Sequence, residues 1–482
     1  MTTENAGTNS NARWLALGVL CLGVLMDVID TTIVNVALPS IKADLGFSAT
    51  NLAWVINAYV LTFGGCLLLS GRLGDLYGHR RLFLFGIAAF SLTSLAAGLA
   101  TTQVVLIVAR AAQGVAGAVV AAVALSLIVD LFPEPGERAK AMGIYGFVCA
   151  GGGSIGAMLG GFLTGALNWH WVFLVNLPIG VAVIALTLRL VPDTHNAPAN
   201  PRLDFLGAAT ITTSLILAVY AIVNGNQAGW TSFTTLGLLG AGVLLFAAFI
   251  AIESRVREPL MPLSMFRLRN VATANIVGVL WAASMFAWFF LSALYMQQVL
   301  GYDPLKVGLA FVPANMIMAI FSLGLSAKMV VRFGLKLPLA LGLALAAAGL
   351  VLFARAPIVG TFVIDVLPGM VLLGLGGGMA FNPVLLAAMS DVDPRDSGLA
   401  SGLVNTSFMM GGALGLAVLA SLAAARTDAL LAAQAAPLLA LNDGYHIAFA
   451  AGAAFAAVAA LAGWIGIRAG AQLDRVGADT AH

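Results

Sequence analysis

Charged side chains are scarce in this sequence. Asp, Glu, Lys and Arg make up 9% of its 482 residues, and hydrophobic residues make up 61%, whereas about a quarter of a soluble globular domain is charged. Mean hydropathy is +0.99. A chain this apolar has lipid rather than water as its solvent. Its net charge of +2 is too small to indicate a nucleic-acid partner, and it contains no nucleic-acid-binding motif.

Cysteine and histidine are also rare, which narrows the chemistry. The three cysteines, Cys21, Cys66 and Cys149, lie in apolar segments, so their odd number indicates packing rather than disulfides or a metal site. The five histidines are scattered and accompany no candidate nucleophile. We therefore predict no metal, no cofactor and no enzymatic activity. The phosphate-loop pattern G-x-x-x-x-G-K-[ST] does not occur, so any transport must draw on an ion gradient or on the substrate's own gradient.

Apolar segments of membrane length fill most of the chain. A transmembrane helix needs about 20 mostly apolar residues, and such segments recur between polar, Gly or Pro breaks. They predict an all-α polytopic membrane protein with about fourteen transmembrane helices. We expect these helices near 13–34, 50–70, 82–100, 104–128, 140–165, 171–190, 205–223, 234–252, 271–296, 306–326, 337–354, 361–388, 398–422 and 446–468. Between the last two, the apolar run 429–441 predicts an interfacial hairpin or helix.

Basic residues are distributed unevenly between the two sides of these helices. One side holds only Lys42, Lys306, Arg355 and Arg426, and most of the others lie on the side of the two termini. Lys and Arg concentrate in cytoplasmic loops. The pattern therefore predicts a multi-pass protein of the cytoplasmic (inner or plasma) membrane with both termini in the cytoplasm. The polar start, residues 1–11, has no basic segment and does not resemble a cleaved signal peptide.

Two acids lie inside the first predicted helix, in MDVIDTTIVNVALP. Asp27 and Asp30 are three residues apart and therefore share one helix face. A charge in lipid costs several kcal/mol and usually serves a function. We expect this pair to bind a proton or another cation. The alternative is that Asp30 only bonds neighbouring backbone groups or caps a break in the helix.

One arginine lies deep in the fourth predicted helix, in LIVARAAQGVAGAV. Arg110 is followed by Gln113, and Gly114 and Gly117 form a small face that allows another helix to approach closely. A buried arginine needs an acceptor, and Asp27 or Asp30 can supply it. The alternative is a structural ion pair with no part in transport.

The polar stretch GRLGDLYGHRR, residues 71–81, separates the second and third apolar segments. We expect its charged groups to bond to helix ends on the same side, with Asp130 as a possible partner, and its glycines to pack tightly. Such a cluster can latch one conformation and open in another. The alternative is an orientation signal in a solvated loop. The predicted latch residues are Gly71, Asp75, Gly78, Arg80, Arg81 and Asp130.

Two further sets of residues are candidates for movement and for substrate contact. The fifth helix carries glycines that allow bending or close packing: Gly152, Gly156, Gly160 and Gly161. The predicted substrate cavity combines aromatic and amide side chains: Trp54, Asn57, Tyr59, Gln113, Trp281, Phe286, Trp288, Tyr295 and Gln298. The alternatives are ordinary small-residue packing for the glycines and contact with lipid for the aromatic side chains.

In combination, these segments resemble the major facilitator superfamily along nearly the whole chain. GRLGDLYGHRR is similar to its signature between helices two and three, with His79 where arginine is usual. LIVARAAQGVAGA is similar to the fourth-helix motif. IDTTIVNVALPSI resembles the first-helix signature of the fourteen-span drug:proton antiporters, with Asp30 as its acid. The fifth helix departs from the antiporter pattern, since Ala157 replaces a proline and removes a kink.

The resemblance implies the major facilitator fold, with two six-helix bundles around a central cavity, two inserted helices and alternating access. LSAKMVVRFGLKL after the tenth span faintly repeats the signature stretch and agrees with two related halves. The implied division is an N-terminal tail (1–12), first bundle (13–190), linker (191–204), inserted pair (205–252), second linker (253–270), second bundle (271–468) and C-terminal tail (469–482).

The function that we predict is proton-coupled efflux of hydrophobic, cationic drugs or toxic compounds by a monomer in membrane lipid. Protons entering on Asp30 or Asp27 would displace the substrate, and Arg110 would tune the acids. The alternatives are an exporter of a specific lipid, siderophore or natural-product antibiotic, a nutrient symporter, and a transport-inactive receptor or scaffold. Loss of pumping in an Asp30→Asn variant would favour the transporters over the scaffold.

Overall fold

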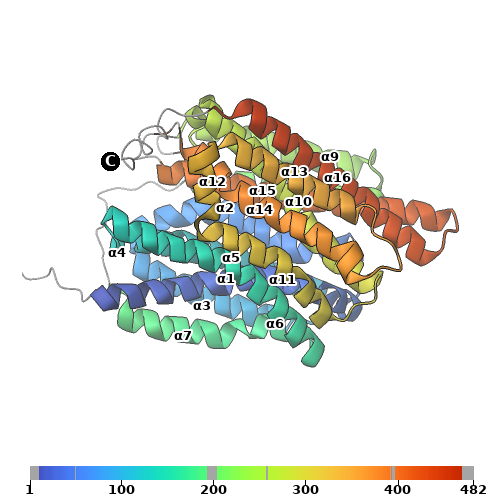
Figure 1. Ribbon diagram of the computed structural model, residues 1–482, viewed down its shortest axis with the longest axis horizontal. Coiled ribbons are helices and arrows are strands. Elements are labelled where there is room, and N and C mark those ends of the chain that lie inside the picture. Colours follow the sequence, from blue (N-terminus) through green and yellow to red (C-terminus); the bar gives the residue numbers. More distant parts are fainter. Residues whose placement is uncertain are drawn as a thin grey trace, which may run out of the picture.

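The computed structural model describes residues 10–48, 50–192, 204–256, 259–390, 392 and 397–468. This part of the chain is almost entirely helical and contains no strand. Thirteen of its helices are long and apolar enough to cross a membrane, and Pro304–Ile320 is a shorter apolar helix. The helices lie side by side in one elongated bundle (Figure 1). The predicted all-α, multi-pass fold class is confirmed.

The helices before the second linker fall into two sets. The N-terminal helix group consists of α1 (Ser10–Leu45), η1 (Asn51–Ala53), α2 (Trp54–Tyr77), α3 (His79–Gly98), α4 (Gln103–Leu131), α5 (Pro135–Ala166), α6 (Trp171–Leu174) and α7 (Asn176–Leu190). The inserted pair consists of α8 (Phe205–Ala228) and α9 (Phe233–Glu253). Within the N-terminal helix group, α2 packs against α4, α1 against α5, and α3 against α4 and α7.

The C-terminal helix group follows the second linker. It consists of η2 (Leu263–Arg267), α10 (Arg269–Gln298), α11 (Pro304–Ile320), η3 (Phe321–Leu325), α12 (Ser326–Phe333), α13 (Lys336–Phe353), η4 (Phe362–Val366), α14 (Leu367–Met389), α15 (Ser397–Ala432) and α16 (Pro437–Gly466). Here α10 packs against α15 and α16, and α13 packs against α14 and α16. The two groups meet mainly along α5 with α11 and α2 with α15, while α8 contacts both α2 and α15.

Several helices continue beyond the ends that hydropathy predicts. The first was expected to end near residue 34, but α1 continues through Pro39 to Leu45. The segment 423–445 belongs to α15 and α16, which are joined by a short turn with Gln434 at φ 60°. This turn projects beyond the neighbouring helices at one end (Figure 1). Alanine and leucine favour helix, and Pro437 occupies a first-turn position of α16, where proline is tolerated.

The polar stretch 71–81 is helical rather than a loop. Helix α2 continues to Tyr77 and α3 begins at His79, so Gly78 alone separates them with φ 89°. Gly334 makes a similar turn between α12 and α13 with φ 73°. These two turns follow the second and tenth predicted spans, the positions at which the sequence suggested a repeat. Positive φ is unfavourable for other residues, which accounts for glycine at both places.

Candidate functional site

Asp30 lies at the centre of a buried polar network in the N-terminal helix group. Its side chain is fully buried, and its Oδ2 accepts a hydrogen bond from Arg110 Nη1. Its Oδ1 accepts bonds from Gln113 Nε2 at 2.8 Å and Asn176 Nδ2 at 2.9 Å. The same two amides donate to Ser94 Oγ at 2.7 and 2.9 Å. Side chains from α1, α3, α4 and α7 therefore hold this carboxylate in place.

Arg110 is 1% exposed, and its surroundings compensate its charge. Besides Asp30, Nη1 donates to Gln113 Oε1 at 2.7 Å and Nε donates to the Val55 carbonyl at 3.0 Å. The guanidinium carbon lies 4.4 Å from the centroid of the Tyr59 ring, which is a cation–π geometry. The expectation that Arg110 finds an acceptor on the first helix is confirmed. The alternative that Asp30 bonds only backbone groups is wrong.

Asp27 has different surroundings, although it lies on the same helix face. It is 6% exposed, and Oδ1 accepts a hydrogen bond from Tyr59 Oη, its one hydrogen bond in the described part of the chain. A Cβ atom on Gly117 would lie 2.6 Å from both of these oxygens, so glycine on α4 makes room for the pair. Asp30 is thus compensated by an arginine and two amides, and Asp27 by one phenol.

Sequence reasoning missed Ser94 and Asn176, which complete the Asp30 network. Ser94 is one of three small hydroxyl residues in SLTSLAAG, and Asn176 is the single polar residue of VFLVNLPIG. Serine and asparagine side chains in membrane helices hydrogen-bond across helix contacts. A polar residue in an apolar segment indicates a buried hydrogen bond. Only the packing of α3 and α7 against α1 and α4, however, shows that these two side chains meet Asp30.

The signature stretch bonds to the ends of neighbouring helices. His79 Nδ1 lies 3.0 Å from Asp130 Oδ2 near the end of α4, and Arg80 Nη2 donates to the Leu188 carbonyl of α7 at 2.7 Å. Asp130 thus meets the stretch through the histidine that replaces the usual arginine. Arg81 is exposed, and the side chain of Asp75 lies outside the described residues. Opening of this contact in a second conformation stays a prediction.

The three glycines of this stretch differ in their surroundings. Gly78 requires its positive φ of 89°. A Cβ atom on Gly74 would lie 2.6 Å from His79 Cδ2. A Cβ atom on Gly71, by contrast, would have nothing within 4 Å, so the expected tight packing does not occur there. The space beside Gly71 on α2 is open, which sequence spacing alone does not show.

The glycines of α5 are sites of close helix packing. Cβ atoms on Gly156 and Gly160 would lie 2.8 and 2.6 Å from backbone oxygens of α1, and one on Gly152 would lie 2.8 Å from a valine side chain there. Gly161 approaches α11, with 2.6 Å from such a Cβ to the Pro304 carbonyl. The helix is continuous over Pro135–Ala166, while Gly324 between α11 and α12 has a non-helical φ of 120°. Bending at the α5 glycines stays a prediction.

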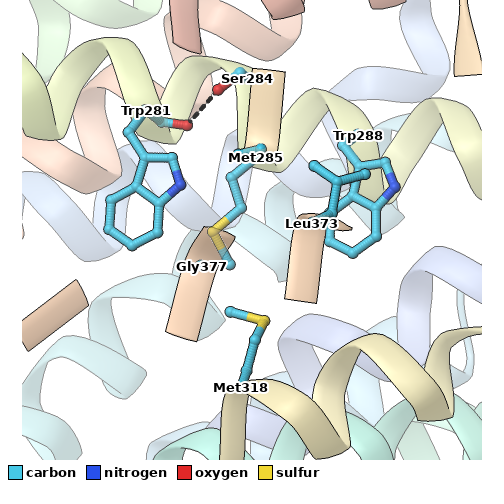
Figure 2. A pocket seen from close by; sticks show the side chains of 8 residues that line it. Trp281, Ser284, Met285, Trp288, Met318, Leu373 and Gly377 are labelled. Atoms are coloured by element: carbon cyan, nitrogen blue, oxygen red, sulfur yellow. Dashed lines mark hydrogen bonds between the residues drawn. The ribbon is translucent and has the colours of Figure 1, made fainter. Parts of the chain in front are cut away.

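The aromatic residues expected to share one substrate cavity are spread over several places. Trp281 and Trp288 flank a small cavity of about 10 Å³ in the C-terminal helix group, with Met285 and Met318 extending into it (Figure 2). Phe286 packs edge-on against Phe408, with ring centroids 6.0 Å apart. The structure therefore places these side chains in the interior of one helix group and not around the acids of α1.

The other expected cavity residues are equally dispersed. Trp54 packs against Tyr220 of α8 with ring centroids 6.3 Å apart, and Tyr295 Oη donates to the Pro357 carbonyl at 2.7 Å. Gln298 lines a separate hollow of about 160 Å³ between the helix groups. Asn57 is fully buried, and neither of its amide atoms has a hydrogen-bond partner within the described residues. Of the nine, Tyr59 and Gln113 bond to the acids or contact Arg110.

Comparison with known sequences identifies the family. The pattern of the Major Facilitator Superfamily matches residues 20–416, a range that contains the whole Asp30 network. The chain belongs to this superfamily. It is 38% identical over 461 residues to the puromycin resistance protein pur8 of Streptomyces alboniger, covering 94% of this chain and 91% of that protein.

Two other relatives of this superfamily member carry names of the same kind. The cephamycin export protein CmcT of Amycolatopsis lactamdurans is 39% identical over 416 residues, covering 86% of this chain and 85% of that protein. The multidrug resistance protein Stp of Mycobacterium tuberculosis (strain CDC 1551 / Oshkosh) is 35% identical over 424 residues, covering 88% of this chain and 78% of that protein. The predicted resemblance to drug-exporting members of the superfamily is therefore confirmed.

Solved structures agree on the fold. A bacterial homologue of the human lysosomal transporter Spinster, in an inward-facing and unoccupied conformation, aligns with a TM-score of 0.66 at 16% identity, covering 95% of this chain and 98% of that one. A mutant of the nucleoside transporter NupG aligns with a TM-score of 0.62 at 14% identity, covering 93% and 98%. At these identities the likeness shows the major facilitator fold and not a shared substrate.

Proposed function

We propose that this superfamily member exports hydrophobic, cationic compounds across the cytoplasmic membrane in exchange for protons, by alternating access between its two helix groups. The export and resistance functions in the names of its relatives support efflux. The excess of basic residues on the side of the termini supports a cytoplasmic location for both ends. The single observation that carries proton coupling is the pair of differently partnered acids on α1.

Asp27 is the proton carrier in this proposal, and Asp30 is the fixed counter-ion of Arg110. Hydrogen bonds donated to a carboxylate stabilise its charged form. Asp30 accepts three such bonds, one of them from a guanidinium, whereas Asp27 accepts one from the neutral Tyr59 hydroxyl. In a water-poor interior, the less compensated carboxylate is the one that gains most from a proton or a substrate cation.

Coupling then follows from competition at one carboxylate. A proton on Asp27 removes the charge that attracts a cationic substrate, and a bound cation removes the advantage of protonation. The Asp30–Arg110 ion pair takes no part in this exchange and gives α1 a rigid frame against α4. We propose that the protein works in this way as a monomer, since one copy of the chain supplies all three donors to Asp30.

The test uses purified protein in proteoliposomes that contain a pH-sensitive dye. A pH gradient is imposed, a panel of lipophilic cations is added, and substrate-triggered proton flux is recorded for wild type, Asp27→Asn and Asp30→Asn. The two substitutions are a matched pair, because they make the same chemical change three residues apart on one helix face. We expect Asp27→Asn to abolish the flux while the protein remains folded.

Asp30→Asn should act differently, through loss of stability and of the Arg110 position. Flux that persists in Asp27→Asn but vanishes in a folded Asp30→Asn protein would identify Asp30 as the proton carrier. Flux that persists in both variants would overturn the assignment to this pair. A folded wild-type protein that shows no flux with any cation would overturn the proposal of cationic multidrug export.

A second candidate is export of one natural-product antibiotic. The names of the puromycin resistance and cephamycin export proteins favour it. Growth of a sensitive host that expresses the chain, measured against a panel of structurally unrelated antibiotics, separates the two candidates. Resistance to one compound class supports the dedicated exporter, and resistance across classes supports the multidrug exporter.

A further inference from the structure

Two buried acids lie at the base of the inserted helix pair, apart from the acids of α1. Asp204 precedes α8 and Glu253 ends α9, and they are 6% and 3% exposed. Asp204 Oδ1 accepts a hydrogen bond from the Gly207 amide at 2.8 Å and thereby caps α8. Glu253 Oε2 accepts one from the Met261 amide at 3.0 Å. Each acid therefore uses one of its two oxygens to hold the backbone.

The other two oxygens face each other without a donor. Asp204 Oδ2 and Glu253 Oε1 are buried and have no hydrogen-bond partner among the described residues. Both converge above Gly207, where a Cβ atom would contact Asp204 Oδ2 and lie 2.7 Å from Glu253 Oε1. Unpaired acceptors cost free energy when they are buried, and two carboxylates that share a site favour uptake of one proton. One proton between these oxygens turns an acceptor into a donor and satisfies both.

Among the described residues, one cation acts on the two acids. The charged group that faces the acids from α2 is Arg72, which acts on Glu253 electrostatically and donates from Nη2 to the Pro259 carbonyl at 2.8 Å. Leu69 of α2, Ala208 of α8 and Leu260 of the second linker form an apolar cluster beside them. With one proton, the two acids carry a single charge opposite one arginine.

We propose that Asp204 and Glu253 form a second proton-binding site, in which the two carboxyl groups share one proton. The site joins α2, the start of α8 and the linker that leads to α10. Release of the proton leaves two like charges in contact beside the signature stretch, which weakens the attachment of the linker to α2 and α8. This site lies outside the proposed efflux site and shares no residue with it.

The first experiment is infrared difference spectroscopy of the full chain in detergent, without substrate, as the pH is raised. Wild type should lose a carbonyl band of a protonated carboxylic acid. This band should be absent from Asp204→Asn and from Glu253→Gln, whose new amides supply a permanent donor. It should remain in Asp27→Asn, which separates it from the proposed transport site, and in the control Asp443→Asn, whose residue pairs with Arg426 on the surface.

Spectra of both variants that match wild type would overturn the proposal. A band lost in only one variant would overturn the sharing of the proton, because the proton would then belong to a single acid. Folding of each variant is checked by a monodisperse elution profile before its spectrum is recorded.

A second measurement on wild type needs no variant. The folded protein holds a proton that the unfolded chain lacks at neutral pH, so stability from this site is lost as the pH rises through proton release. The melting temperature should therefore fall over that pH range and should not depend on which alkali cation is present. A melting temperature that rises with sodium or potassium at constant pH would show a metal-cation site and would overturn the proton.

Discussion

Removal of the negative charge from Asp30 should destabilise the protein strongly. In Asp30→Asn, the new amide oxygen still accepts hydrogen bonds from Gln113 and Asn176. The new NH2 group takes the place of Oδ2, which accepts from Arg110 in the wild type, so two donors face each other. Loss of one partner of a buried ion pair costs about 3–5 kcal/mol. Arg110 keeps its bonds to Gln113 and the Val55 carbonyl, so we expect the lower end, about 3 kcal/mol.

A double-mutant cycle isolates the pair from the rest of the network. In Asp30→Asn with Arg110→Gln, neither member of this ion pair is left as a charge without its partner. The double variant should therefore be less destabilised than the sum of the two single variants, by about 2 kcal/mol. The assay is unfolding by SDS in mixed micelles, followed through tryptophan fluorescence, from which the free energy of unfolding is obtained.

An exposed ion pair provides the control for this cycle. Arg426 Nε lies 2.7 Å from Asp443 Oδ2, and both side chains are 43% exposed. Surface pairs contribute about 0–1 kcal/mol, so Asp443→Asn should change the free energy of unfolding little. A cost below about 1 kcal/mol for Asp30→Asn, or single effects that simply add, would refute the reasoning that the buried pair fixes α1 to α4.

Two comparisons between glycines test the packing arguments. Gly78→Ala should lower the free energy of unfolding by about 1–2 kcal/mol, because φ is 89° at this position. Gly71→Ala places its Cβ atom in open space and should change the free energy of unfolding by no more than about 0.5 kcal/mol. Equal effects of the two substitutions in SDS unfolding would contradict this. Gly161→Ala should disfavour the contact of α5 with the Pro304 carbonyl, 2.6 Å from the new Cβ atom, and reduce disulfide cross-linking between cysteines placed on α5 and α11. Gly165→Ala, with nothing within 4 Å, should leave that cross-linking unchanged.

Much of the fold follows from the sequence because hydropathy is a local property. Long apolar segments predict the helices one by one, and even the short turn at Gly334 is visible as a faint repeat of the turn at Gly78. The helix ends were predicted less well. Helix α1 continues to Leu45 and α15 to Ala432, since a helix does not need to end where its sequence becomes polar.

The candidate site was predictable where it is charged and unpredictable where it is neutral. An acid or arginine within an apolar segment is conspicuous because its burial is expensive, so Asp30 and Arg110 were identified as possible partners. Ser94 and Asn176 are not conspicuous, although both complete the same network. The aromatic residues mislead for a related reason: they pack equally well in an interior, against lipid or around a ligand, and their sequence positions do not distinguish these places.

The division of contacts between the two helix groups fits a rocking motion. The Asp30 network is built from α1, α3, α4 and α7, so a rocking motion would carry it together with the N-terminal helix group. The described contacts across the groups include a neutral hydrogen bond, from Gln297 Nε2 to the Val36 carbonyl at 2.8 Å, and close backbone packing of Gly161 against Pro304. Separation of the two helix groups at these contacts breaks a neutral hydrogen bond and exposes small apolar surfaces. The free-energy cost is far lower than that of an uncompensated charge in a membrane. In the described part of the chain, the Asp30–Arg110 pair and these contacts between the groups therefore lie in different places.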